Sequence, residues 1–213
     1  MQKTAELEDL RIRRTRKLLQ RALIDLTVEK GFAAITVRDI TERAMVNRST
    51  FYRHYLDKYQ LLNEYLDEVA VMIAAEVFEE GKLKVHHQST NADKPEVPAG
   101  LLALLKHIQQ HPDFYRVMLG EKGDSAFIQR FRQNNELHYR RMLELSEAKL
   151  DAHDAPLDMR LSYVSCAGIG AILWWLENDQ PCAAEQLAVW LGQLSSTSIG
   201  LHFNIGLEIP RKP

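Results

Sequence analysis

The sequence predicts an all-α protein of about nine helices, with a small N-terminal three-helix domain followed by a larger C-terminal helical domain. Nearly every periodic segment has apolar residues at the three- and four-residue spacing of a helix, and no stretch alternates convincingly as a strand. Pro112, Pro156 and Pro181 stand near the starts of three predicted helices, where proline is well tolerated. We expect the domain boundary to divide residues 1–58 from 59–213.

Local signals predict the first two helices. A helix over about 9–30 has one apolar stripe, and Gly31 follows it at a position where a left-handed conformation suits glycine. Thr36 begins the second helix with Asp39 three residues later, which is the spacing of a capping box. The inner face of this helix is predicted to carry Val37, Ile40 and Ala44.

The remaining helices follow from the same kinds of signal. Asn47 is a good N-cap for a short third helix. Asp57, with Gln60 at the capping-box position, predicts the start of a long amphipathic fourth helix that runs to about residue 80. Residues 81–98 are polar, contain two prolines and predict a surface loop. Further helices are predicted at about 98–110, 112–121, 124–150, 157–178 and 183–203.

Charge is distributed unevenly along the chain. Residues 1–60 hold 13 Lys/Arg against 8 Asp/Glu, whereas residues 61–213 hold 14 against 21. A basic N-terminal part on an acidic body indicates that only the N-terminal part meets a polyanion. The two cysteines, Cys166 and Cys182, stand in no metal-binding or redox motif, and the N-terminus lacks the apolar region of a signal peptide. The longest uncharged run, Leu161–Leu176, is shorter than the ~20 apolar residues of a membrane span, so we expect a buried helix in a cytoplasmic protein without membrane contact.

The third predicted helix carries polar groups that suit the major groove of DNA. A recognition helix places its N-terminal side chains on base edges, and an arginine there can bind guanine through two hydrogen bonds. Phe51 and Tyr55 lie four residues apart and are expected to pack inward, which leaves the polar groups outside. A solvated helix face of similar composition remains the alternative. The candidate DNA-binding residues on this helix are Arg48, Ser49, Thr50, Tyr52, Arg53 and His54.

Helix N-termini add candidate phosphate sites, because free N–H groups and the positive end of the helix dipole lie there. Thr36 begins one such helix, and Lys58 adds a cation at the first turn of another.

The segment ITVRDITERAMVNRSTFYRHYLDKYQLL, residues 35–62, resembles the TetR family of bacterial transcriptional repressors. The likeness extends weakly back through RRTRKLLQRALIDLTVEKGFAAI. The resemblance implies that Val37 and Arg38 lie against DNA and that Arg48, Ser49 and Thr50 form the base-reading turn. It also implies that Tyr52 and His54 bind phosphates, that Arg53 contacts the backbone or a base edge, and that Lys58 holds a phosphate.

Met45 departs from the family pattern, because many members have glycine in this turn. A left-handed methionine costs roughly 1 kcal/mol or more. We therefore expect either that the turn avoids this conformation or that nearby packing offsets the strain.

The resemblance also implies a C-terminal domain that dimerises and holds a small-molecule pocket. Small and aromatic residues on the last two long helices are the candidate dimer interface, with Trp174 and Trp175 pointing to different sides. A central core helix of the same composition is the alternative. The candidate interface residues are Ala167, Gly168, Gly170, Ala171, Trp174, Trp175, Trp190 and Leu194.

Aromatic, methionine and histidine side chains are the candidates for the pocket, although such residues are more often plain core. They are His107, Phe114, Tyr115, Met118, Phe127, Tyr139, Met142 and Tyr163. The implied function is a repressor that binds a palindromic operator as a homodimer. An unidentified small-molecule effector releases it, with a hinge at the fourth helix.

Other classes of protein fit less well. The chain has no nucleophile elbow, phosphate-binding loop or zinc-protease motif, so we expect no enzyme activity, no cofactor and no bound metal. The adjacent His86 and His87 lack acidic or thiol neighbours. A helical protein of the same family that works through protein–protein contacts, without reading DNA, remains the alternative function.

Overall fold

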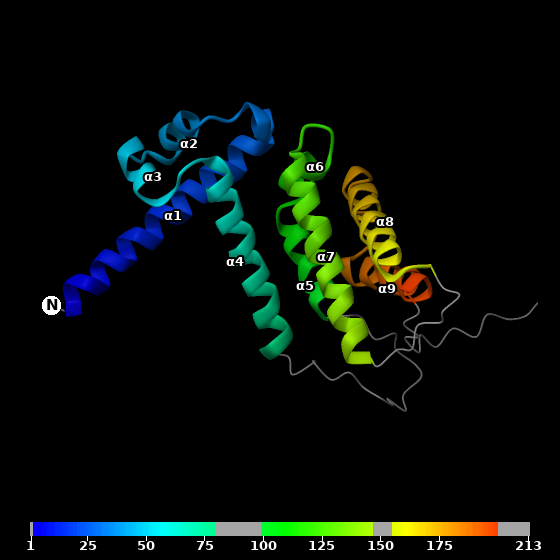
Figure 1. Ribbon diagram of the computed structural model, residues 1–213. Helices are drawn as coiled ribbons and strands as arrows, with labels where there is room; N and C mark the ends of the chain where they lie inside the picture. Colours follow the sequence, from blue (N-terminus) through cyan, green and yellow to red (C-terminus); the bar gives the residue numbers. More distant parts are fainter. Residues whose placement is uncertain (1, 80–98, 147–154, 200–213) are drawn as a thin grey trace, which may run out of the picture. The chain divides into compact units, whose positions relative to one another are not determined.

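The computed structural model describes residues 2–79, 99–146 and 155–199, and these contain nine α-helices, one short 3-10 helix and no strand, which confirms the predicted fold class (Figure 1). The elements in order are α1 (Gln2–Lys30), η1 (Phe32–Ala34), α2 (Val37–Ala44), α3 (Arg48–His54), α4 (Lys58–Glu79), α5 (Ala99–Gln110), α6 (Pro112–Leu119), α7 (Ser125–Ser146), α8 (Leu157–Glu177) and α9 (Ala184–Ile199). The first helix begins at Gln2 rather than near residue 9, and the predicted loop over 81–98 lies outside the described residues.

The chain forms two compact units. The first comprises Met1–Met72 and Asp113–Ser125, and the second comprises Ile73–Pro112 and Ala126–Pro213. α4 therefore begins in the first unit and ends in the second. The boundary expected between residues 58 and 59 stays a prediction.

The first unit is built around a core of side chains from α1, η1, α2, α3 and α4. Phe51 and Tyr55 are buried, as predicted, together with Leu23, Phe32 and Ile40. Val37 is only half-buried, so the inner face of α2 is completed by Thr41 instead. α6, which is distant from these helices in sequence, also belongs to this unit. The ring of its Phe114 packs edge-on against Tyr65 of α4, with 5.9 Å between the ring centroids.

Capping interactions fix where the short helices begin. The Thr36 side chain accepts a hydrogen bond from the Asp39 N–H, and the Asp39 carboxylate accepts one from the Thr36 N–H, which confirms the capping box. The Asn47 side chain caps α3 by accepting from the Ser49 N–H at 2.9 Å. Asp57 caps α4 through the Gln60 N–H, but the Gln60 side chain accepts from the Leu56 N–H and not from Asp57. The second predicted capping box is therefore shifted by one residue.

In the second unit, α5 and α8 both pack against α9. Trp175 of α8 is fully buried, and its indole Nε1 donates to the Cys182 carbonyl at 2.8 Å. α7 is joined to α8 by an ion pair between Arg140 and Asp158 and to α9 by a hydrogen bond between Tyr139 and Ser195. Among the described helices, α8 is long and apolar enough to cross a membrane on length and composition alone, a criterion that core helices of soluble proteins also meet.

Candidate nucleic-acid interface

The recognition helix α3 presents its polar residues to solvent. Arg48, Ser49 and Arg53 are exposed, and Tyr52 is 47% exposed beside the buried Phe51. Thr50 and His54 are half-buried at the edges of the same surface. The predicted division of α3 into an inner aromatic side and an outer polar side is therefore confirmed for the side chains themselves. Their contacts with DNA stay a prediction.

Arg48 and Tyr52 hold each other one helical turn apart. The Arg48 Nη2 donates to the Tyr52 hydroxyl at 3.2 Å, and the guanidinium carbon lies 5.4 Å from the centre of the Tyr52 ring. This contact engages one N–H of the guanidinium, which carries five donors in all. The pair therefore limits the directions that Arg48 can take while leaving donors for a base or a phosphate.

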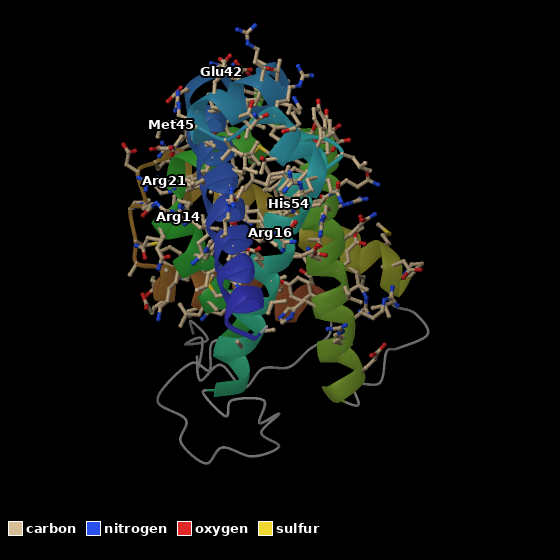
Figure 2. The ribbon with its side chains drawn as sticks, turned by 90° about the vertical axis from the view of Figure 1, so that its left-hand side faces the viewer. Arg14, Arg16, Arg21, Glu42, Met45 and His54 are labelled. Carbon is tan, nitrogen blue, oxygen red and sulfur yellow. The ribbon has the colours of Figure 1, made fainter. Side chains whose placement is uncertain are left out.

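An open depression of about 510 Å³ lies at the helix-turn-helix and brings residues of α2 together with the start of α3. Figure 2 shows Glu42 and Met45 at this part of the molecule. Of the predicted DNA-binding residues, Arg38 and Arg48 border the depression. Its lining consists of Arg38, Thr41, Glu42, Met45, Val46, Asn47 and Arg48.

Glu42 was missed by the sequence analysis, although its position four residues after Arg38 could have revealed it. The Arg38 Nε donates to the Glu42 carboxylate at 2.7 Å, and the two side chains are 77% and 63% exposed. This pairing raises the pKa of Arg38. An ion pair so exposed contributes little to stability, so Arg38 can exchange the carboxylate for a phosphate.

Lys58 does not present the free cation that its position implied. Its ammonium donates hydrogen bonds to the backbone carbonyls of Phe32, Ala33 and Ile35 at 2.8, 3.1 and 2.9 Å. It also lies 4.7 Å from the centre of the Phe32 ring. Burial lowers the pKa of Lys58. An ammonium has three N–H donors, and all three are engaged by these carbonyls. Lys58 therefore stabilises the backbone around η1 and has no N–H left to donate to a phosphate.

Met45 adopts the left-handed conformation, with φ 53° and ψ 40°. Its N–H donates to Glu42 and the Val46 N–H donates to Thr41, which is the hydrogen-bonding pattern of a Schellman motif. The Met45 side chain is 92% exposed, so it packs against nothing that would offset the strain. Both expected alternatives were therefore wrong: the turn does adopt the left-handed conformation, and no side-chain packing offsets its strain.

The structure divides the predicted pocket residues between the two units. Phe114, Tyr115 and Met118 are fully packed in the first unit, whereas His107, Phe127 and Tyr139 belong to the second. Tyr163 is 64% exposed on α8 and is corrected from a pocket residue to a surface one. Met142 lies on α7, and its side chain is outside the described part of the structure.

The predicted interface residues separate into an outer face and one core residue. Trp174, Trp190 and Leu194 are exposed, and of the small residues Ala167 and Gly170 are exposed while Gly168 and Ala171 are half-buried. A Cβ added at Gly168 or Gly170 would meet no atom within 4 Å. Trp175 is corrected, because a residue with no exposed surface belongs to the core of the second unit and cannot contact a partner.

A short, capped recognition helix with an exposed arginine, joined to a larger helical unit, defines a DNA-binding transcriptional regulator. Two family descriptions match the chain, "Bacterial regulatory proteins, tetR family" over residues 20–65 and "Transcriptional regulator C-terminal region" over residues 96–197. The chain belongs to the TetR family of bacterial transcriptional regulators. Because this family and the relatives below are regulators and not enzymes, the expectation of no enzyme activity is confirmed.

Individual relatives agree with the family. The HTH-type transcriptional regulator YxbF of Bacillus subtilis (strain 168) is 28% identical over 182 residues, which cover 84% of this chain and 44% of YxbF. This chain thus spans less than half the length of that relative. The structure of a TetR transcriptional regulator from Streptococcus agalactiae 2603V is similar with a TM-score of 0.62 and 28% identity, covering 90% of this chain and 98% of the other. The dihydroxyacetone kinase operon activator DhaS shares the fold, with a TM-score of 0.57, 20% identity and coverage of 88% and 97%.

Proposed function

We propose that the protein binds a palindromic DNA operator as a homodimer, represses transcription there, and is released by a small-molecule effector in the bacterial cytoplasm. The observation that carries this proposal is the Arg48–Tyr52 pair, exposed on the first two turns of α3 and held beside Arg38 of α2. An arginine at this place in a recognition helix reads guanine in the major groove. Repression, rather than activation, of transcription is typical of the family.

The exposed residues around this pair would position the protein on the DNA backbone. Ser49, Tyr52 and Arg53 offer hydroxyl and guanidinium donors on the outer side of α3, and His54 lies at its end. Thr36, Val37 and Arg38 stand at the N-terminus of α2, where free N–H groups favour a phosphate. We do not include Lys58 among the residues proposed to contact DNA directly, because its N–H donors are engaged by backbone carbonyl groups.

An exposed apolar face on α8 and α9 supports the proposed dimer. Met159, Tyr163 and Trp174 follow one side of α8 and are 65%, 64% and 47% exposed, while Trp190 and Leu194 lie one turn apart on α9. Contiguous apolar surface of this kind marks an interaction site. Gly168 and Gly170 leave room for close approach of a second helix. Two copies joined through this face would form a four-helix interface, and a two-fold axis would match the symmetry of a palindromic operator.

We place the effector site in the second unit, where His107, Phe127 and Tyr139 are candidates to line it, with Met142 beside them in sequence on α7. α4 continues from the DNA-reading unit into the second unit, so it can carry a displacement between them. Effector binding would favour a dimer whose recognition helices no longer fit major grooves about 34 Å apart. Linkage then requires operator DNA to weaken effector binding by the same factor.

The test is fluorescence anisotropy with the DNA that flanks the protein's own gene, against random DNA of the same length, at two salt concentrations. We expect tight, salt-sensitive binding to the first DNA only, because phosphate contacts release counterions. Arg48→Ala should weaken this binding about 10- to 100-fold, the value of a bidentate arginine–guanine contact. Arg141→Ala, which removes an exposed arginine of α7 in the second unit, is the matched control and should change little.

Equal and weak binding to both DNAs would contradict operator reading at that site. If a library of random duplexes also yields no preferred sequence, the alternative function through protein–protein contacts takes its place. Salt dependence separates the two, because an apolar protein contact does not weaken steeply as salt rises.

A further inference from the structure

The N-terminal half of α1 carries a concentration of positive charge that the helix-turn-helix does not use. Between Leu10 and Arg21 the sequence contains six Lys/Arg and no Asp/Glu. Arg11, Arg14, Lys17 and Arg21 are exposed, and their spacing of three, three and four residues places them on one side of the helix. The buried residues of α1, among them Leu19 and Leu23, lie on the opposite side. We call these four cations the α1 basic face.

Other cations of the same unit have carboxylate partners. Arg16 pairs with Glu64, Lys30 with Asp39, Arg38 with Glu42 and Arg43 with Glu29. The four cations of the α1 basic face form no ion pair with any side chain that the structure describes. Like charges three and four residues apart repel along a helix, so this arrangement costs stability in the free protein. A polyanion would relieve that repulsion.

α1, which carries the basic face, packs against α2 of the helix-turn-helix. A pair of hydrogen bonds, 2.7 and 2.6 Å long, joins the Arg43 guanidinium of α2 to the Glu29 carboxylate at the end of α1. In Figure 2, Arg14 and Arg21 lie on the same side of the first unit as Met45, whose turn leads into α3. At 1.5 Å per residue, the ten-residue step from Arg11 to Arg21 is about 15 Å long, which is enough to face several phosphates.

We propose that the α1 basic face binds the sugar-phosphate backbone of DNA that flanks the base pairs read by α3. This inference rests on the proposed operator binding and adds a second contact surface to it. The contact is electrostatic and independent of sequence, so it lengthens the DNA footprint and increases affinity without changing the preferred base pairs.

The test compares two duplexes that share one site, selected in vitro from random DNA with the full-length protein, and differ only in flank length. We expect the wild type to bind the long-flank duplex more tightly and the triple variant Arg14→Ala/Lys17→Ala/Arg21→Ala to bind both equally. Each lost phosphate contact lowers the salt slope by about 0.9. For each half-site with an extended flank, the three lost contacts should make the affinity gain between about 200 and about 50 mM salt roughly 40-fold smaller for the triple variant.

Two further variants separate specific contact from net charge. Lys106→Ala/Arg140→Ala/Arg141→Ala removes the same charge from the second unit and should keep the flank dependence. Arg14→Lys/Arg21→Lys keeps the charges and should also keep it, because a phosphate accepts an ammonium as well as a guanidinium. Circular dichroism melts confirm that all variants fold.

A triple variant with the flank dependence and salt slope of the wild type would overturn the inference and leave the α1 basic face as a solvated surface. A wild type that selects no DNA sequence at all would instead overturn the proposed function together with this inference. The two failures are therefore distinguishable.

Discussion

Met45 occupies a backbone conformation that glycine adopts without strain, and its side chain makes no compensating contact. Two backbone hydrogen bonds, from Met45 to Glu42 at 3.2 Å and from Val46 to Thr41 at 3.0 Å, hold the turn. These bonds are available to any residue at this position, so they fix the left-handed geometry without regard to the side chain. The strain of the Cβ is thus a cost at the position that leads into the recognition helix.

We predict that Met45→Gly raises the free energy of unfolding by about 0.5–1 kcal/mol. Removing the Cβ relieves the left-handed strain, and the greater entropy of glycine in the unfolded chain offsets part of the gain. Urea denaturation followed by circular dichroism measures the change. Met45→Ala is the control, since it shortens the side chain but keeps the Cβ. A glycine variant no more stable than the alanine variant would contradict the prediction, because the relief of strain would then not exceed the entropy cost of glycine.

Local signals in the sequence were sufficient for the residues whose partners lie within four positions. Thr36 with Asp39 and Asn47 with Ser49 were predicted because a cap is defined by its own turn. Lys58 was not, since its acceptors lie 23 to 26 residues earlier and only the packing of η1 on α4 brings them together. Trp174 and Trp175 are a second case that local signals could not decide. Helical periodicity places the two side chains on different sides of α8, but it does not indicate which side faces the core.

At the scale of an element, Lys58 fastens the first turn of α4 to η1. We predict that Lys58→Met lowers the free energy of unfolding by about 2 kcal/mol, because the Ala33 and Ile35 carbonyls lose this donor and the Phe32 carbonyl keeps only the Ile35 N–H. Lys106→Met is the control, since its ion pair with Glu185 is half exposed and contributes at most about 1 kcal/mol. If Lys58→Met keeps full stability but loses binding to random DNA, then Lys58 does hold a phosphate and the present assignment is wrong.

His107 on α5 makes the second unit sensitive to pH. Burial, together with the neighbouring His111 at 5.0 Å between ring centroids, lowers the pKa of His107 to about 4. Its ordinary value is 6.5. The unfolded chain therefore binds this proton more readily than the folded protein, so stability is fully present above pH 6.5 and is lost as pH falls toward 4.

We predict that His107→Gln removes about 2 kcal/mol of the stability difference between pH 7 and pH 5. Thermal or urea unfolding of both proteins at the two pH values gives this difference directly. The comparison between variant and wild type matters, because every other titratable group contributes equally to the pH dependence of both proteins. A pH dependence that is the same with and without His107 would mean that this imidazole titrates normally in the folded protein.

At the scale of the whole molecule, the helices could be predicted but their grouping could not. Apolar periodicity predicts that each helix has a buried side, but it does not indicate which other helix covers that side. The sequence analysis therefore assigned α6 to the C-terminal domain. In the structure, residues 113–125 cluster with the first unit, where Phe114 packs on Tyr65 and the Lys122 backbone lies close to Gly31. These contacts join residues 49 and 91 positions apart in sequence, and a single sequence carries no local sign of them.

The proposed dimer depends on apolar side chains that are exposed to solvent in the single chain. Leu194 is 68% exposed on α9, so a charge there leaves the fold of the protomer intact. At the centre of an apolar interface the same charge would be buried without a partner on both copies. We predict that Leu194→Glu shifts the protein from dimer to monomer at micromolar concentration in sedimentation equilibrium, and that it weakens binding to a two-half-site operator more than to a single half-site.

Leu137→Glu provides the matched control, because Leu137 is 48% exposed on α7, a helix that is not part of the proposed face on α8 and α9. It should sediment as the wild type does. The reverse result, with Leu137→Glu monomeric and Leu194→Glu dimeric, would move the interface to α7. Two monomeric variants would mean instead that added negative charge on the second unit is enough to separate the copies, and salt would then restore the dimer by screening that repulsion.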